Sequence, residues 1–201
     1  MEIICLDLEG VLVPEIWISF AELTGIDALR ATTRDVPDYD ELMRRRLSLL
    51  DEHGLGMRDI QRVIARLRPL EGATAFLAAL RSEYQVVILS DTFYEFAKPL
   101  MERLNWPTLF CHRLKVDHVG RIVDYRIRLP DHKRRAVAAF KALNFSTVAA
   151  GDSYNDTGML GEADTGILFC PPRNVIDEFP QFPVTRNYQE LHERIRQTAG
   201  R

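Results

Sequence analysis

Four short apolar runs constrain the fold of this chain more than any other feature. They occupy residues 3–6, 85–89, 147–150 and 165–169, and turn-forming residues bound each of them. Helical patterns of apolar residues separate most of the runs. Uninterrupted apolar runs of this length are typical of strands that are buried on both faces, with helices as the crossovers between them. The sequence therefore predicts an α/β fold with a Rossmann-like parallel sheet.

An insertion follows the first run. Nearly eighty residues separate it from the second run, which is several times what a single crossover needs. Helical patterns cover residues 15–24 and 39–53, and a third one lies around residues 60–67. We therefore predict a small helical cap domain over residues 14–70.

The rest of the chain, residues 1–13 and 71–201, is predicted to form a discontinuous catalytic core. Within it, residues 113–128 alternate apolar and polar side chains around a central turn, which indicates a small β-hairpin. The apolar spacing of residues 188–198 predicts a closing helix.

Acidic and hydroxyl side chains follow three of the predicted strands. They are Asp7 with Glu9, Ser90 with Asp91, and Asp152 with Asn155 and Asp156. One such residue alone is most often a turn former or a helix cap. Parallel strands, however, place their carboxyl ends at one edge of the sheet, so we expect these groups to converge. Carboxylates that meet there repel one another unless a cation lies among them, and Mg²⁺ suits such hard oxygen ligands.

Two cations are predicted to face the same edge. On the helix over residues 39–53, Arg46 lies on the apolar stripe, whereas Arg44 and Arg45 do not. On a second helix, Lys133 is in phase with the apolar residues, and a cation in a first helical turn is favoured when an anion lies opposite. The alternative for both is a side chain that runs along an apolar surface toward water.

The composition limits the partners and the compartment. The formal net charge is −3 with scattered Lys and Arg, which disfavours nucleic acid as a partner. The three cysteines form no CxxC pair, and no apolar run reaches the length of a membrane span, so we expect a soluble, cytoplasmic protein, monomeric or homodimeric. The five histidines are dispersed without paired ligand spacing; a zinc site is not expected, and roles at the surface and in loops suffice for them.

Four motifs together resemble the haloacid dehalogenase-like phosphatase superfamily. In chain order they are Asp7-Leu8-Glu9-Gly10, Leu89-Ser90-Asp91, Lys133, and Gly151-Asp152-Ser153-Tyr154-Asn155-Asp156. Within the superfamily the chain is similar to the phosphoserine phosphatases, because the stretches around Arg46 and at residues 70–72 resemble that group's cap and its exit. The resemblance runs nearly from end to end. It implies Mg²⁺ as the cofactor, phosphoserine as the substrate and an aspartyl-phosphate intermediate.

The resemblance also implies a role for each site residue. Asp7 matches the nucleophile and Glu9 the second acid. The metal site is expected to involve Asp7, Glu9 through its carbonyl, and Asp152. The predicted substrate-binding residues are Glu15, Arg46, Ser90, Asp91, Lys133 and Asn155. Of these, Glu15 and Arg46 match the residues for the ammonium and carboxylate of the substrate, although Glu15 lies one residue closer to Asp7 than expected.

The family usually has Asp where this chain has Glu9. A Glu there is found in bacterial phosphoserine phosphatases that also transfer the phosphoryl group to homoserine, so the resemblance implies homoserine as a possible acceptor. The alternatives are a phosphatase for another small phosphate ester and a non-catalytic sensor of phosphorylated metabolites. Dehalogenation is disfavoured by Glu9 and Asp152, and a sensor would be expected to lack one of the catalytic groups, all of which are filled here.

Overall fold

The computed structural model, described here for residues 1–32, 35–36 and 38–198, has an α/β architecture. In the described residues seven strands form one sheet in the order β4-β3-β2-β1-β5-β6-β7. The strands are β1 (Glu2–Leu6), β2 (Gln85–Phe93), β3 (Thr108–Val116), β4 (Ile122–Arg126), β5 (Ser146–Gly151), β6 (Thr165–Phe169) and β7 (Val184–Thr185). All neighbouring strands pair in parallel except β3 and β4. The predicted fold class is confirmed, since the four apolar runs lie in β1, β2, β5 and β6.

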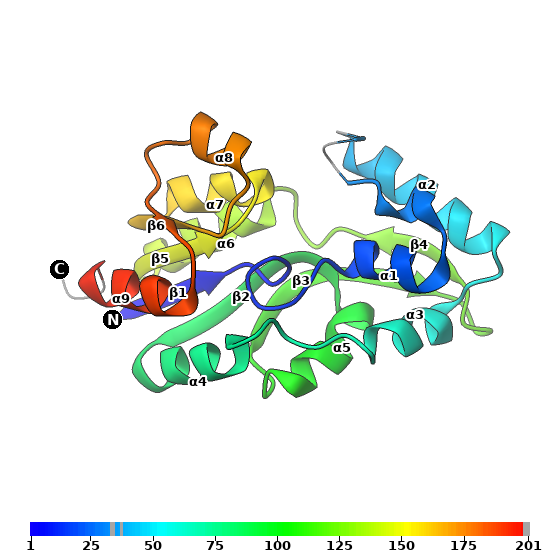
Figure 1. Cartoon of the computed structure of the whole chain (residues 1–201), viewed down its shortest axis with the longest axis horizontal. Coiled ribbons are helices and arrows are strands. Elements are labelled where there is room, and N and C mark those ends of the chain that lie inside the picture. The colour runs from blue at the N-terminus through cyan, green and yellow to red at the C-terminus, as the bar shows by residue number, and fades with distance from the viewer. Residues whose placement is uncertain (33–34, 37, 199–201) are drawn as a thin grey trace.

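Helices cover both faces of the sheet. They are α1 (Ile16–Thr24), η1 (Asp27–Arg30), α2 (Tyr39–Glu52), α3 (Met57–Ile64), α4 (Ala73–Glu83), α5 (Tyr94–Arg103), α6 (His132–Ala142), η2 (Tyr154–Asp156), α7 (Thr157–Glu162), α8 (Arg173–Glu178) and α9 (Tyr188–Thr198). Figure 1 shows α4 and α5 on one side of the sheet and α6 and α7 on the other. Strand β1 serves both layers, because Ile4 and Leu6 face one apolar cluster while Ile3 and Cys5 face the other.

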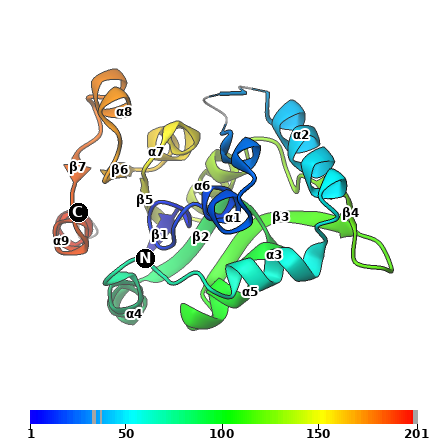
Figure 2. The same ribbon diagram turned by 45° about the vertical axis from the view of Figure 1, so that its right-hand side comes forward.

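The inserted segment lies beside the carboxyl edge of the sheet. It contains α1, η1, α2 and α3, and Figure 2 shows these helices grouped on one side of β1. Helix α3 packs against α1 and α5. The larger apolar cluster runs continuously from this segment into the core, for example from Phe20 and Leu50 to Phe96. The separation of residues 14–70 as a cap domain stays a prediction.

The predicted hairpin is present but is part of the main sheet. Strand β4 pairs antiparallel with β3, with Arg113 opposite Arg126. Strand β3 begins five residues earlier, at Thr108, and its first half pairs in parallel with β2. The hairpin also contacts the insertion: Arg121 pairs with Asp51 at 2.6 Å. It therefore links the edge of the sheet to α2.

A bulge interrupts β2 where it reaches the site. Leu89 pairs with Phe110, but the next pair is Phe93 with His112, so four residues of β2 span two residues of β3. Such an insertion bends a strand and redirects its side chains. Ser90 and Asp91 lie within this irregular part of β2 and line a cavity. Within the described residues, no helix is both long and apolar enough to span a bilayer.

Candidate active site

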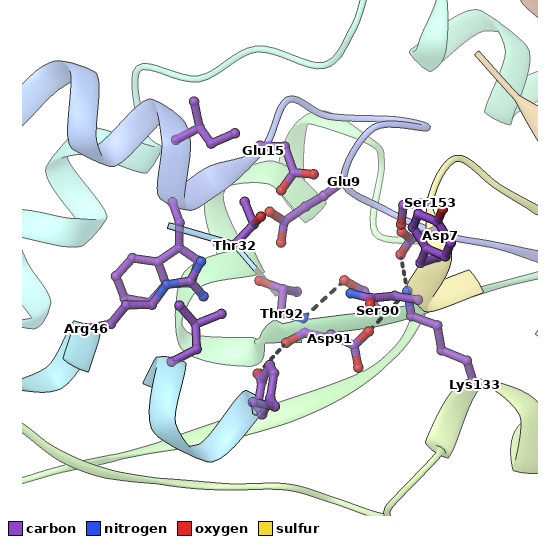
Figure 3. A pocket seen from close by; sticks show the side chains of 16 residues that line it. Asp7, Glu9, Glu15, Thr32, Arg46, Ser90, Asp91, Thr92, Lys133 and Ser153 are labelled. Carbon is purple, nitrogen blue, oxygen red and sulfur yellow. Dashed lines mark hydrogen bonds and ion pairs between the residues drawn. The ribbon is translucent and has the colours of Figure 1, made fainter. Parts of the chain in front are cut away.

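A cavity of about 310 Å³ lies outside the carboxyl ends of β1, β2 and β5. The predicted residues that line it are Asp7, Glu9, Glu15, Arg46, Ser90, Asp91, Lys133 and Asn155. Figure 3 shows Asp7 and Lys133 at one end of this cavity and Arg46 at the other, with Glu9 and Glu15 facing each other between them. The arrangement follows from the parallel topology, which brings the three strand ends to one edge.

Asp7 is buried at the end of β1 and contacts a cation directly. Lys133 Nζ lies 3.0 Å from its Oδ1, and the backbone N–H of Leu8 donates to the same oxygen at 2.7 Å. Burial raises the pKa of Asp7 well above its usual value; Asp156 and Asp152 raise it further, and Lys133 opposes them. A carboxylate in this environment needs added positive charge to be fully ionised at neutral pH.

Two further acids converge on the nucleophile candidate. One carboxylate oxygen from each of Asp7, Asp152 and Asp156 lies within 4.8 Å of the others. Burial raises the pKa of Asp152 to about 7, with Asp156 and Glu15 as the next causes. A cluster of hard oxygen donors that repel one another in this way fits a divalent cation such as Mg²⁺.

Asp156 also has a structural task that sequence reasoning left open. Its Oδ2 accepts the backbone N–H groups of Asp152 and Ser153 at 2.9 and 3.1 Å, and its Oδ1 accepts from Lys133 at 2.9 Å. A Cβ on Gly151 would lie 2.3 Å from Asp156 Cγ, so only glycine leaves room for this carboxylate. Asp156 thereby shapes the loop that presents Asp152.

Lys133 lies among three carboxylates. Its Nζ is 2.9 Å from Asp156 Oδ1, 3.0 Å from Asp7 Oδ1 and 3.3 Å from Asp91 Oδ2. Burial lowers the pKa of Lys133, but the acids around it raise it well above the usual value on balance. The prediction from helical phase is confirmed in position: Lys133 is 5% exposed, whereas Arg134 and Arg135 are exposed.

The second acid, Glu9, lies between Asp7 and Arg46 in the cavity (Figure 3). Its Oε2 accepts the backbone N–H of Ile16 at 2.8 Å, which joins it to the first turn of α1. Burial raises the pKa of Glu9 to about 8, and Glu15 adds to this rise. The carboxylate of Glu9 is not part of the acid cluster at Asp7, so its predicted link to the metal concerns only its backbone carbonyl. A protonated Glu9 at neutral pH could serve as a general acid.

Arg46 is buried next to Glu9 and Glu15. It is 8% exposed, while Arg44 and Arg45 are exposed, as helical phase predicted. Its Nη2 donates to the carbonyl of Ala31 at 2.8 Å, and its guanidinium carbon lies 4.5 Å from the centre of the Trp17 ring. Among the described residues its buried Nε has no hydrogen-bond partner. An orphaned donor of this kind in a cavity wall suits an anionic group of a ligand.

Sequence reasoning did not predict two buried histidines of this region. His112 and His132 are 2% and 3% exposed, so the expectation of surface and loop roles is wrong for them. Both face Asp91, from β3 and from the start of α6. Twenty residues separate them, and only the neighbouring Lys133 could have drawn attention to one of them. Trp17, Thr32 and Tyr39 also line the cavity without having been predicted.

Comparisons with known proteins identify relatives of this chain. The family model for haloacid dehalogenase-like hydrolases matches residues 1–164. Phosphoserine phosphatase ThrH of Pseudomonas aeruginosa is 62% identical over 201 residues, covering 100% of this chain and 98% of the relative. A phosphoserine phosphatase of Methanocaldococcus jannaschii is 28% identical over 142 residues, covering 66% of this chain and 65% of the relative.

Solved structures give the same picture of the fold. A phosphoserine phosphatase in its apo form superposes with a TM-score of 0.77 at 24% identity, over 96% of this chain and 98% of that one. A substrate-bound phosphoserine phosphatase complex gives a TM-score of 0.78 at 23% identity, over 96% and 97% of the two chains. At these identities the likeness concerns the fold.

Proposed function

The chain belongs to the haloacid dehalogenase-like hydrolase family, and on that premise we propose that it is a Mg²⁺-dependent phosphoserine phosphatase with Asp7 as the nucleophile. The observation that carries the proposal is the division of one cavity into two ends. At one end Asp7 lies against Lys133, which suits a phosphoryl group; at the other, Arg46 and Glu15 suit the carboxylate and ammonium of an amino acid.

The residues of the first end perform the transfer. An oxygen of the Asp7 carboxylate attacks phosphorus in line, and the bond between phosphorus and the serine oxygen breaks. Lys133 and Ser90 donate to the phosphoryl oxygens as charge develops on them. Asp7 and Asp152, with the Glu9 carbonyl, would hold Mg²⁺, which supplies positive charge against the phosphoryl oxygens.

Glu9, between the two ends, moves the protons. With its pKa raised to about 8 it is protonated at neutral pH and gives its proton to the departing serine oxygen. As a carboxylate it then takes a proton from water, which attacks phosphorus and releases Asp7. Each half-reaction therefore leaves Glu9 in the protonation state that the next one requires.

Homoserine as the acceptor in place of water is a further part of the proposal. Glu9 is joined to α1 through Ile16, so an alcohol bound beneath this helix would meet the same base that activates water. Arg46 and Glu15 would bind the carboxylate and ammonium that serine and homoserine share. The expected setting is serine and threonine biosynthesis in the cytoplasm.

Incubation with phosphoserine and Mg²⁺, with and without homoserine, tests both reactions. Free phosphate and phosphohomoserine are the products to follow, and absence of both would refute the amino-acid assignment. A panel of other small phosphate esters then separates a different phosphatase from a non-catalytic sensor, because the sensor would turn over none of them.

Asp7→Asn tests the nucleophile. The variant should form no phosphoenzyme in acid-quenched samples, whereas Asp177→Asn, an exposed acid in α8, should label like the unsubstituted protein. Normal turnover by Asp7→Asn would show that another group attacks phosphorus.

A further inference from the structure

Asp91 lies at the boundary between the catalytic cavity and a second one. The second cavity, of about 320 Å³, is lined by Asp91, His112, His132 and Lys133 among others. The Asp91 side chain is 35% exposed, while both histidine side chains are 3% exposed. The cluster therefore combines one solvent-accessible carboxylate with two buried rings.

The two oxygens of Asp91 have separate partners. Oδ1 lies 3.1 Å from His132 Nε2 and 3.5 Å from His112 Nε2. Oδ2 lies 3.3 Å from Lys133 Nζ. Through Asp91, the histidines are connected to the cation that contacts Asp7.

Hydrogen-bond donors determine the state of both rings. The backbone N–H of Arg128 donates to His112 Nδ1 at 3.3 Å, so this nitrogen is an acceptor. The Arg128 guanidinium, which has only donors, lies 3.3 Å from His132 Nδ1, so this nitrogen also accepts. Each neutral ring must then carry its proton on Nε2 and donate it to Asp91. Burial lowers the pKa of His132, against the opposing effect of Asp91, which agrees with a neutral ring.

The same hydrogen bonds argue against a metal ion held by Asp91, His112 and His132, although their ligand atoms lie within 4.8 Å of one another. A histidine that binds a metal through Nε2 donates a proton from Nδ1 to an acceptor. Here both Nδ1 atoms face donors from Arg128 instead. The two rings therefore donate hydrogen bonds to the carboxylate of Asp91 and do not form a metal site with it.

We infer that His112 and His132 are positioning residues that hold Asp91 so that its second oxygen orients Lys133 for phosphoryl transfer. An ammonium group has three N–H bonds, and Lys133 has three carboxylates around it, with Asp91 as the most distant. Asp7 and Asp156 hold the ammonium group by the two shorter contacts; Asp91 adds the third, which limits the movement of Nζ relative to the phosphoryl site. Without the histidines, the accessible Asp91 side chain would turn toward solvent, and Nζ would lose this third point of contact.

Steady-state kinetics of matched variants test the inference. Because it rests on the proposed role of Asp7 but not on phosphoserine, both phosphoserine and acetyl phosphate serve as donors. His132→Leu and Asp91→Asn should each lower kcat about tenfold with KM changed less than about threefold, since orientation is lost while the Lys133 charge remains. His132→Gln, which keeps an N–H near the Nε2 position, should recover most of kcat. His118→Leu, at an exposed turn, should behave like the unsubstituted protein.

The double variant gives the sharper result. If His132 acts through Asp91, then Asp91→Asn with His132→Leu should lose no more than either single variant. Losses that multiply to about a hundredfold, or a normal kcat for His132→Leu, would overturn the inference. Cleavage of acetyl phosphate but not of phosphoserine would refute the phosphoserine assignment. The relative kcat values of the variants on acetyl phosphate would then still test the role of the histidines.

Nitrogen-15 NMR of the unsubstituted protein tests the network independently of activity and of variant folding. We expect His112 and His132 as neutral rings protonated on Nε2. Protonation on Nδ1, a charged ring at neutral pH, or a shift of these signals on addition of Zn²⁺ would each overturn the assignment.

Discussion

Replacing Asp152 by Asn should make the metal-free protein more stable at alkaline pH. The carboxyl of Asp152 has a pKa of about 7 in the folded protein, because of burial and of its neighbours Asp156 and Glu15, against an ordinary value of 3.8. As the pH rises from about 4 to about 7, the unfolded chain releases this proton more readily than the native protein does. The native state therefore loses stability over that range.

The size of the effect follows from the two pKa values. They differ by about 3 pH units, and each unit corresponds to about 1.36 kcal/mol, so Asp152 costs the native state up to about 4 kcal/mol at pH 8. At pH 5 the same reasoning gives about 1.5 kcal/mol, because the pH is then only about one unit above the ordinary pKa. The gain from Asp152→Asn should therefore grow by roughly 2–3 kcal/mol between pH 5 and pH 8.

Urea unfolding in EDTA at both pH values measures this difference. Asp177→Asn is the matched control, since it changes an exposed acid in the same way and should alter the free energy of unfolding by less than about 0.5 kcal/mol at either pH. Equal slopes against urea concentration are required, so that a change in the midpoint reports stability alone.

Two outcomes would refute the reasoning. One is a gain that is the same at pH 5 and pH 8, and the other is a loss of stability at pH 8. Replacing EDTA by excess MgCl₂ adds a second comparison: the ion should stabilise the unsubstituted protein by mass action and the Asp152→Asn variant much less. Equal stabilisation of the two proteins would show that Asp152 is not a ligand of the ion.

Three further predictions concern other parts of the site. The kcat/KM for phosphoserine should fall as pH rises through about 8, because Glu9 then loses the proton that the leaving serine needs. The leaving group of acetyl phosphate needs no proton, so its pH profile should lack this fall. Gly151→Ala should lower the free energy of unfolding by about 3 kcal/mol or more, because the new Cβ would lie 2.3 Å from Asp156 Cγ; a normal melting temperature would contradict this. Arg46→Met should raise KM for phosphoserine about a hundredfold or more while leaving the turnover of acetyl phosphate within about threefold, and equal losses on both donors would count against a carboxylate-binding role.

Much of the fold could be predicted because its signals are local. An apolar run between turn residues indicates a buried strand wherever it occurs, and β1, β2, β5 and β6 were found in this way. The phase of a helix likewise predicted that Arg46 and Lys133 are buried while their basic neighbours are exposed. The first half of β3 was missed as a parallel partner of β2, because pairing between strands depends on contacts across the sheet and leaves little trace in either strand alone.

The candidate site, like the fold, could be predicted only in part from the sequence. The order of the motifs predicted which acids follow which strands, and the parallel topology then required Asp7 and Asp152 to meet. Only the tertiary structure showed that Asp156 accepts the backbone N–H groups of its loop and that His112 and His132 face Asp91.

The sequence by itself therefore determined the class of fold, the edge at which the chemistry takes place and the residue types that gather there, since strand order and helical phase are properties of short segments. The tertiary structure alone decided the protonation of Glu9, the extent to which burial raises the pKa of Asp7 and the three-carboxylate environment of Lys133. These depend on burial and on distances of a few ångströms between segments far apart in the chain, where a loss of solvent and a neighbouring charge change the free energy of an ionised group by several kcal/mol.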